Sequence, residues 1–250
     1  MVRIRNQTKK IIPISFLSQG LTLNGFLHLP DKEKPPVVIG SHGLFSSGNS
    51  PKQIALAKKC TDIGMAYFRF DHRGCGKSEG NFQQVTSLAG RVSDLSTAVK
   101  VIHEHPETGN KIAIFGSSLG GTTGLSLIDN HKIHAIVTIA APLRSEPIFN
   151  AAKSTGDLRG LPLSFYEKQL RFDITDNLSK VSNILIFHGD SDQTVPVADA
   201  YELFSKASEP KKLIIQKDGD HSMSKLLHQI HFMKTASEWF KRWLLASESI

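Results

Sequence analysis

The fold is decided near the middle of the chain by the stretch Ile112-Ala113-Ile114-Phe115-Gly116-Ser117-Ser118-Leu119-Gly120-Gly121. Residues 112–115 form an apolar run suited to a buried strand, and the residues after Gly120 have helical period. A serine in a Gly-x-Ser-x-Gly turn between a strand and a helix is held in a strained conformation that lifts its hydroxyl above the sheet. Gly116 and Gly120 have no Cβ to obstruct the approach of helix to strand. These features make Ser118, rather than Ser117, the candidate nucleophile.

Apolar runs that are suited to buried strands alternate with segments of helical period along most of the chain. This alternation predicts an α/β fold, with right-handed crossovers and a mostly parallel sheet that has helices on both faces. Residues 9–16 and 21–29 have no helix between them, so we expect an antiparallel hairpin at the sheet edge. The runs expected to be parallel strands are residues 37–41, 65–70, 111–115, 135–140, 183–187 and 211–215.

Two of the expected helices carry clear signals. Ser50-Pro51-Lys52-Gln53 offers an N-cap, a proline at the first helical position and the glutamine of a capping box, and Gly64 ends that helix. The last helix has apolar side chains at spacings of three and four, a stripe that we expect to dock on the sheet. The stripe consists of Leu226, Leu227, Ile230, Met233, Trp239, Phe240 and Trp243.

The composition predicts one soluble domain over residues 1–250, with 40% hydrophobic and 21% charged residues. No apolar run approaches the ~20 residues of a membrane-spanning helix, so no stable membrane insertion is expected. Residues 1–17 combine basic residues with a short apolar patch that contains Pro13 and lacks a cleavage site, which favours a first strand over a signal peptide. Only Cys60 and Cys75 occur, without C-x-x-C spacing. This usage fits a reducing compartment and predicts a cytoplasmic protein without a disulfide framework or a structural zinc site.

The net charge of +7 and a pI near 9.4 raise the question of nucleic-acid binding. The basic residues are dispersed in pairs and have no aromatic residues between them, which favours a solvated surface and no nucleic-acid partner. A mild preference for anionic partners stays open. The pairs are Lys9-Lys10, Lys58-Lys59 and Lys211-Lys212.

Residues 142–182 exceed an ordinary connection between two strands. They contain prolines and scattered aromatic residues between the run that ends near Ala141 and the run that starts near Asn183. A connection of this length usually serves as a lid or a binding segment. We therefore expect a small cap inserted into the single domain.

A serine hydroxyl becomes nucleophilic only when an oriented base takes its proton, so a histidine and a carboxylate are expected at other strand ends. The segment His188-Gly189-Asp190-Ser191-Asp192-Gln193-Thr194-Val195-Pro196 follows one strand, and Asp218-Gly219-Asp220-His221 follows the next. Open α/β sheets place their sites at these carboxyl ends. The candidates are therefore His221 as the base and Asp192 or Asp190 as the acid.

In these motifs the chain resembles the α/β-hydrolase superfamily, and the resemblance extends from Val37 onward. The order Ser118, Asp192, His221 is the order of that fold's triad. The superfamily's H-G-x-x-D-x-x-V-P segment matches this chain from His188 to Pro196, which favours Asp192 over Asp190. His221 stands in the position of the late G-x-H loop. The other histidines considered lie in helices where exposure or packing explains them: His103, His105, His228 and His231.

Acyl transfer also needs hydrogen-bond donors for the oxyanion. One expected donor is the backbone N–H of Leu119, the residue after the nucleophile. In related hydrolases with a His-Gly motif after the first parallel strand, the next amide completes the hole, which implies Leu44 here. A side chain at Gly43 would block close approach of the backbone to substrate, and His42 is expected to brace the loop by hydrogen bonding.

Residues 71–80 contain Gly-Lys-Ser after a strand, which suggests a phosphate-binding loop. Such a loop needs a glycine five positions before Gly76, where this chain has Asp71, and no helix is expected to start at Ser78. The segment instead resembles the D-x-R-G-x-G-x-S loop of α/β-hydrolases.

The resemblance implies a serine hydrolase of carboxylic esters that works through an acyl-enzyme without a metal or cofactor. The short insertion is similar to that of feruloyl esterases and monoglyceride lipases. Three alternatives stay open: an aminopeptidase, with Glu146 or Glu167 holding the substrate amine, a thioesterase, and a non-catalytic ligand-binding protein. The physiological ester and the oligomeric state cannot be derived from the residues.

Overall fold

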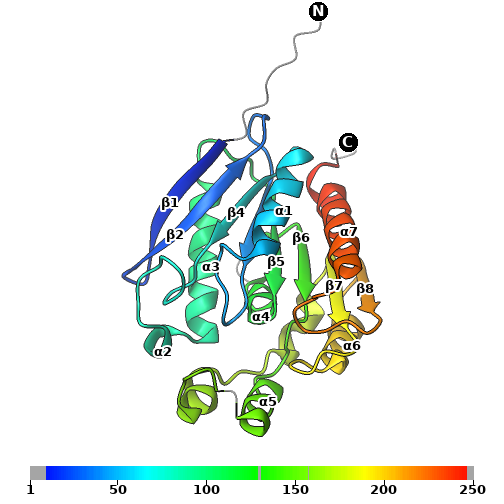
Figure 1. The fold of residues 1–250 in the computed structure, drawn as a ribbon. Coiled ribbons are helices and arrows are strands. Elements are labelled where there is room, and N and C mark those ends of the chain that lie inside the picture. The colour runs from blue at the N-terminus through cyan, green and yellow to red at the C-terminus, as the bar shows by residue number, and fades with distance from the viewer. Residues whose placement is uncertain (1–9, 129–130, 157, 247–250) are drawn as a thin grey trace, which may run out of the picture.

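The computed structural model describes residues 10–128, 131–156 and 158–246. Its centre is an eight-stranded sheet with the order β1-β2-β4-β3-β5-β6-β7-β8 (Figure 1). In this order, the neighbouring strands β4, β3, β5, β6, β7 and β8 are parallel, while β2 is antiparallel to both β1 and β4. The predicted α/β-hydrolase fold and edge hairpin are confirmed, although Lys9 lies outside the described residues. The strands are β1 (Lys10–Ser18), β2 (Leu21–Leu29), β3 (Val37–Ser41), β4 (Ala66–Phe70), β5 (Ile112–Ser117), β6 (Ala135–Ile139), β7 (Ile184–Gly189) and β8 (Lys211–Gln216).

Helices cover both faces of the sheet (Figure 1). Successive strand residues face opposite sides, so Val37 and Ile39 join one buried cluster while Val38 joins the other. The first cluster includes side chains from α3, α4 and α6, and the second includes side chains from α1 and α7. The helices are α1 (Pro51–Asp62), α2 (Phe82–Val85), α3 (Leu88–His103), α4 (Leu119–Leu125), α5 (Glu146–Thr155), α6 (Val197–Lys206) and α7 (Leu226–Leu244).

Helix α1 begins where the sequence predicts. The Ser50 hydroxyl accepts a hydrogen bond from the Gln53 backbone N–H at 3.4 Å, and Gly64 has a φ of 84° just past the helix end. The Gln53 side chain does not complete a capping box, because its oxygen accepts a hydrogen bond from the buried Tyr67 hydroxyl instead. The cap is therefore one-sided, and the glutamine ties α1 to β4.

The predicted apolar stripe on α7 is wrong in its first half. Leu226, Leu227 and Ile230 are 68%, 77% and 56% exposed, whereas Phe232 is fully buried. A helix turns about 100° per residue, so Ile230 lies about 200° around the helix from Phe232. The spacing of three and four residues joined two different faces. The face that packs on the sheet comprises Phe232, Ala236, Ser237, Trp239, Phe240 and Leu244.

The described residues of the 142–182 segment connect β6 to β7, and α5 lies beyond the carboxyl ends of the strands (Figure 1). Near the two ends of the segment, Leu143, Leu178 and Val181 join the first buried cluster. The segment contains α5, the π-helical turn η2 (Phe165–Gln169) and the 3-10 helix η3 (Thr175–Lys180). Phe165, Tyr166 and Leu170 of this segment form a buried cluster with Leu44 and Leu119 of the sheet edge. In the three described ranges, no helix is both long and apolar enough to cross a membrane.

Candidate active site

Ser118 occupies a strained turn between β5 and α4. Its φ of 52° and ψ of −127° are outside the regions that non-glycine residues favour. A Cβ added to Gly116 would lie 2.4 Å from the Gly120 carbonyl oxygen, and one added to Gly120 would lie 2.1 Å from the Ser41 carbonyl oxygen. The turn therefore requires both glycines, since any side chain there would collide with backbone.

The structure brings Ser118, Asp192 and His221 together from three separate loops. The Nε2 atom of His221 lies 3.1 Å from the Ser118 hydroxyl oxygen, and its Nδ1 atom lies 2.7 Å from Oδ2 of Asp192. The carboxylate accepts a hydrogen bond from the Nδ1–H group, which leaves the lone pair of Nε2 facing the serine. This is the arrangement in which a histidine can remove the serine proton.

The Asp192 side chain is fully buried and held by several donors. Its Oδ1 accepts from the backbone N–H groups of Thr194 and Val195, each at 2.8 Å, and His188 Nε2 lies 3.3 Å from Oδ2. Burial would raise the pKa of Asp192, but the hydrogen bonds from His188, His221 and Val195 hold that pKa well below its usual value. Asp190 is exposed and accepts a hydrogen bond from Ser191, so Asp192 is the carboxylate that orients His221.

The loop after β3 lies against the nucleophile. A Cβ added to Gly43 would lie 3.5 Å from the Ser118 Cβ, which measures how closely this backbone approaches the serine. Among the described residues, neither the Leu44 N–H nor the Leu119 N–H donates a hydrogen bond within the chain. Both amides are therefore available to an oxygen bound beside Ser118.

His42 braces this loop from inside. Its Nδ1 donates to the Gly43 carbonyl at 2.8 Å, and its Nε2 accepts from the His72 backbone N–H at 3.0 Å. Complete burial, with smaller contributions from Arg91 and His72, lowers the pKa of His42 well below its usual value. The neutral imidazole uses both nitrogens structurally, so it is not available as a second base.

A cavity of about 820 Å³ opens onto Ser118 and His221, a size suited to a small organic ligand. One side is lined by Phe45 and by apolar side chains of residues 142–182, and the other by residues of α1 and α7. Lys52 and Arg159 are cations in the lining, and no described lining residue is acidic. Within the described ranges, no group of three or more His, Cys, Asp or Glu residues could hold a metal ion.

The comparison with protein families agrees with this geometry. The model of the Hydrolase_4 family, described as serine aminopeptidase S33, matches residues 32–170, which is more than half of the chain. The chain belongs to the Hydrolase_4 family. The name of the family does not itself decide which bond this member cleaves.

Relatives and structural neighbours of this Hydrolase_4 member carry different descriptions. The chain is 30% identical over 190 residues to the uncharacterized protein YfhR of Escherichia coli K12, covering 74% of this chain and 62% of YfhR. It is 26% identical over 219 residues to the mouse mitochondrial palmitoyl-protein thioesterase ABHD10, covering 77% and 71% of the two chains. Est1E from Butyrivibrio proteoclasticus, solved with ferulic acid, has the same fold, with a TM-score of 0.79, 21% identity and coverage of 93% and 100%. The chain is thus an α/β-hydrolase that has a thioesterase among its relatives and shares its fold with Est1E.

Three polar residues around the site were missed in the sequence: His72, Arg91 and Asp94. A signal for two of them exists, because Arg91 and Asp94 are in phase with the buried α3 residues Leu95, Ala98, Val99 and Ile102. Charged residues within a buried stripe indicate an internal polar network. His72 carries no such signal, and His188 was matched to the H-G-x-x-D-x-x-V-P segment without a predicted role.

Proposed function

We propose that this chain hydrolyses carboxylic esters through an acyl-enzyme formed on Ser118. The observation that carries the proposal is the continuous contact from Asp192 through His221 to the Ser118 hydroxyl. A neutral histidine that is oriented by a carboxylate and accepts the serine proton makes the hydroxyl reactive at neutral pH.

The proposed reaction follows from the geometry. Ser118 Oγ attacks the ester carbonyl while His221 Nε2 takes the hydroxyl proton, and the Leu44 and Leu119 amides stabilise the oxyanion. His221 then gives the proton to the departing alcohol, and Asp192 stabilises the transient imidazolium. A water molecule, deprotonated by His221, attacks the acyl-enzyme and releases the acid and the free serine.

Residues 142–182 are proposed to cap the site and to select the acyl group. The proposal is supported by the apolar side chains that this segment contributes to the cavity lining, among them Ile148 and Tyr166. An acyl chain bound there would lie against an apolar wall, which favours hydrophobic acids.

A thioester is the second candidate substrate, because a relative that is 26% identical is named a palmitoyl-protein thioesterase. The same triad can cleave both bonds. Peptidase activity is less well supported, since Glu146 and Glu167 are both exposed and neither lines the cavity. A matched pair of butyryl oxygen ester and butyryl thioester, compared by kcat/KM, decides between the two acyl substrates.

The location is proposed to be cytoplasmic, on the evidence of the buried free thiols of Cys60 and Cys75. Fractionation of the source cells with an antibody to this chain tests that proposal. Recovery of the chain from an oxidising compartment would contradict it.

The decisive experiment compares two adjacent serines. Ser118→Ala is expected to lower p-nitrophenyl butyrate turnover by about 10⁶-fold, as in other triads that lose their nucleophile. Ser117→Ala is the matched control, since Ser117 also lines the cavity but does not contact His221. We expect a fluorophosphonate probe to label wild type and Ser117→Ala but not Ser118→Ala. Absence of labelling on folded wild type would support the non-catalytic alternative instead.

A further inference from the structure

Arg91 is a buried arginine with an unusual set of partners. It is among the largest fully buried side chains, and its guanidinium donates to the backbone carbonyls of His42 at 2.8 Å, Leu44 at 3.2 Å and Gly43 at 3.3 Å. It also lies 3.7 Å from the Cys75 sulfur. In the described part of the chain, Arg91 forms no ion pair with a carboxylate. Its partners are thus concentrated on the loop expected to supply an oxyanion donor.

The bond to the Gly43 carbonyl determines where the Leu44 N–H points. A trans peptide is planar, so the carbonyl of Gly43 and the N–H of Leu44 point in opposite directions. Arg91 and His42 both donate to that carbonyl, at 3.3 Å and 2.8 Å, and hold it toward the protein interior. The N–H on the opposite side of the peptide is left without an internal partner. Two donors on one carbonyl therefore set the direction of one oxyanion donor.

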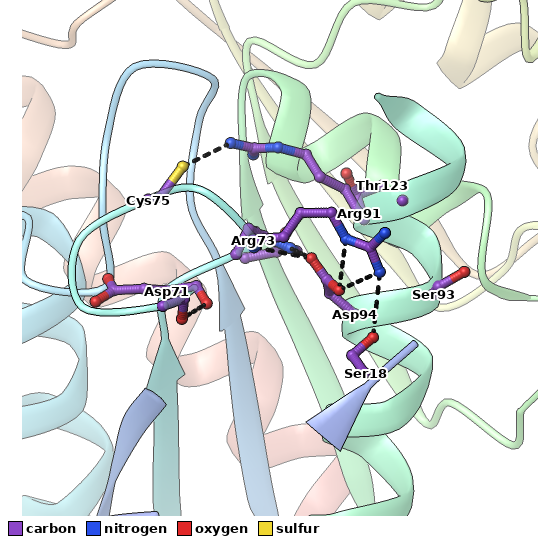
Figure 2. A network of polar contacts seen from close by, with 12 residues as sticks. Ser18, Asp71, Arg73, Cys75, Arg91, Ser93, Asp94 and Thr123 are labelled. Carbon is purple, nitrogen blue, oxygen red and sulfur yellow. Dashed lines mark hydrogen bonds and ion pairs between the residues drawn. The ribbon is translucent and has the colours of Figure 1, made fainter. Parts of the chain in front are cut away.

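The neighbouring Arg73 makes the contacts of a structural arginine, which differ from those of Arg91. Arg73 donates to Asp94 at 2.7 Å and to Ser18 at 3.3 Å and makes no contact with the loop after β3. Figure 2 shows the two guanidinium groups pointing in opposite directions, with Arg73 toward Asp94 and Arg91 toward Cys75. Arg73 forms a direct ion pair with Asp94, whereas the hydrogen-bond partners of Arg91 among the described residues are backbone carbonyls and a thiol. Asp94 acts on Arg91 only as a nearby charge, so the positive charge of Arg91 lies behind the oxyanion loop without a carboxylate in direct contact.

We propose that Arg91 is a positioning residue for the oxyanion hole. Its guanidinium orients the Gly43-Leu44 peptide so that the Leu44 N–H faces the reacting oxygen, and its positive charge favours negative charge on that oxygen. The inference rests on the proposed function of Ser118. Lysine cannot replace the residue fully, since a single ammonium cannot reach three carbonyls in the geometry of the planar fork.

The test compares Arg91→Met, Arg91→Gln and Arg91→Lys with Arg73→Met, each normalised to the fraction of sites titrated by a fluorophosphonate. We expect Arg91→Met to lower kcat for p-nitrophenyl butyrate about 10²-fold, the loss typical of one missing oxyanion donor, with KM within threefold of wild type. Affinity for a trifluoromethyl ketone, which forms an oxyanion on Ser118, is expected to fall by the same factor. The pH at half-maximal kcat/KM should not move, because Arg91 does not touch the triad.

Arg91→Gln keeps donors without charge and Arg91→Lys keeps charge with fewer donors, so we expect losses of about tenfold in both. Arg73→Met should lose stability but retain kcat within threefold. Folded Arg91→Met with wild-type kcat and ketone affinity would overturn the inference. If Arg91→Met does not fold, wild-type kcat in folded Arg91→Lys and Arg91→Gln overturns it equally. Wild type that is not labelled at Ser118 would overturn the proposed function as well, and so separates the two failures.

Discussion

The carboxyl edge of the sheet and residues 142–182 line the same cavity, yet their backbones are constrained very differently. A Cβ on Gly120 at the edge would lie 2.1 Å from a backbone oxygen, whereas one on Gly156 or Gly160 of the inserted segment has nothing within 4 Å. The ion pairs differ in the same way, since Asp94 behind the edge is 0% exposed and Asp173 of the segment is 56% exposed. The backbone at the edge leaves no space for an added side chain, whereas the backbone at Gly156 and Gly160 of the segment does.

The largest difference in the free energy of unfolding is expected between substitutions of Asp94 and Asp173. Asp94→Asn leaves the buried Arg73 without its counter-ion and should lower the free energy of unfolding by about 3 to 5 kcal/mol. Asp173→Asn removes an exposed charge and should cost less than about 1 kcal/mol. Urea denaturation at pH 7 measures both changes. Equal losses in the two variants would break the comparison.

The pH dependence of stability also distinguishes Asp94 from Asp173. Burial opposes ionisation of Asp94, but hydrogen bonds from His72 and Arg73 lower its pKa from 3.8 to about 2. A carboxylate with a depressed folded pKa stabilises the protein above pH 3.8, and the contribution is lost as pH falls toward 2. A shift of this size corresponds to roughly 2 kcal/mol. Urea midpoints between pH 5 and pH 3 should fall less steeply in Asp94→Asn than in Asp173→Asn.

A smaller difference in the free energy of unfolding is expected between substitutions of Gly120 and Gly156. Gly120→Ala forces α4 away from the loop after β3 and should cost about 3 kcal/mol, with slower labelling of Ser118. Gly156→Ala has space for its methyl group, so its only expected cost comes from placing alanine at a φ of 69°. This cost is about 1 kcal/mol of stability. Denaturant unfolding and fluorophosphonate labelling rates check both variants. A Gly120→Ala variant with wild-type stability would show that the edge can relax.

The smallest effect is expected inside the inserted segment. Ala151 lines the cavity, so Ala151→Leu should raise KM about tenfold for a bulky acyl ester and leave p-nitrophenyl acetate within threefold. Ser154→Leu is the matched control on the exposed side of α5. Steady-state kinetics with both esters give the comparison. An equal effect of Ala151→Leu on both esters would place the acyl group elsewhere.

Much of this molecule could be predicted because its signals are local. The strand-turn-helix around Ser118 and the alternation of strands and helices along the chain follow from periodicity and turn chemistry, and both agree with the structure. The α7 stripe was wrong because spacings of three and four fit two adjacent faces of a long helix, and only packing decides between them. Arg91 and Asp94 were missed because apolar periodicity identifies the buried face of a helix by its apolar residues and not by the charged residues in the same stripe.

The sequence by itself determined the fold class, the elbow that contains Ser118 and the loops from which an acid and a base could come, since these depend on residues close together in the chain. The H-G-x-x-D-x-x-V-P segment already favoured Asp192 over Asp190. The tertiary structure alone decided that His221 contacts both Asp192 and Ser118, and that Arg91 reaches carbonyls of the loop after β3. The reason is physical: hydrogen bonds are directional and act over about 3 Å. The pairs that form between distant segments therefore depend on how the whole sheet positions its loops. A local sequence pattern does not give the distance between two such loops.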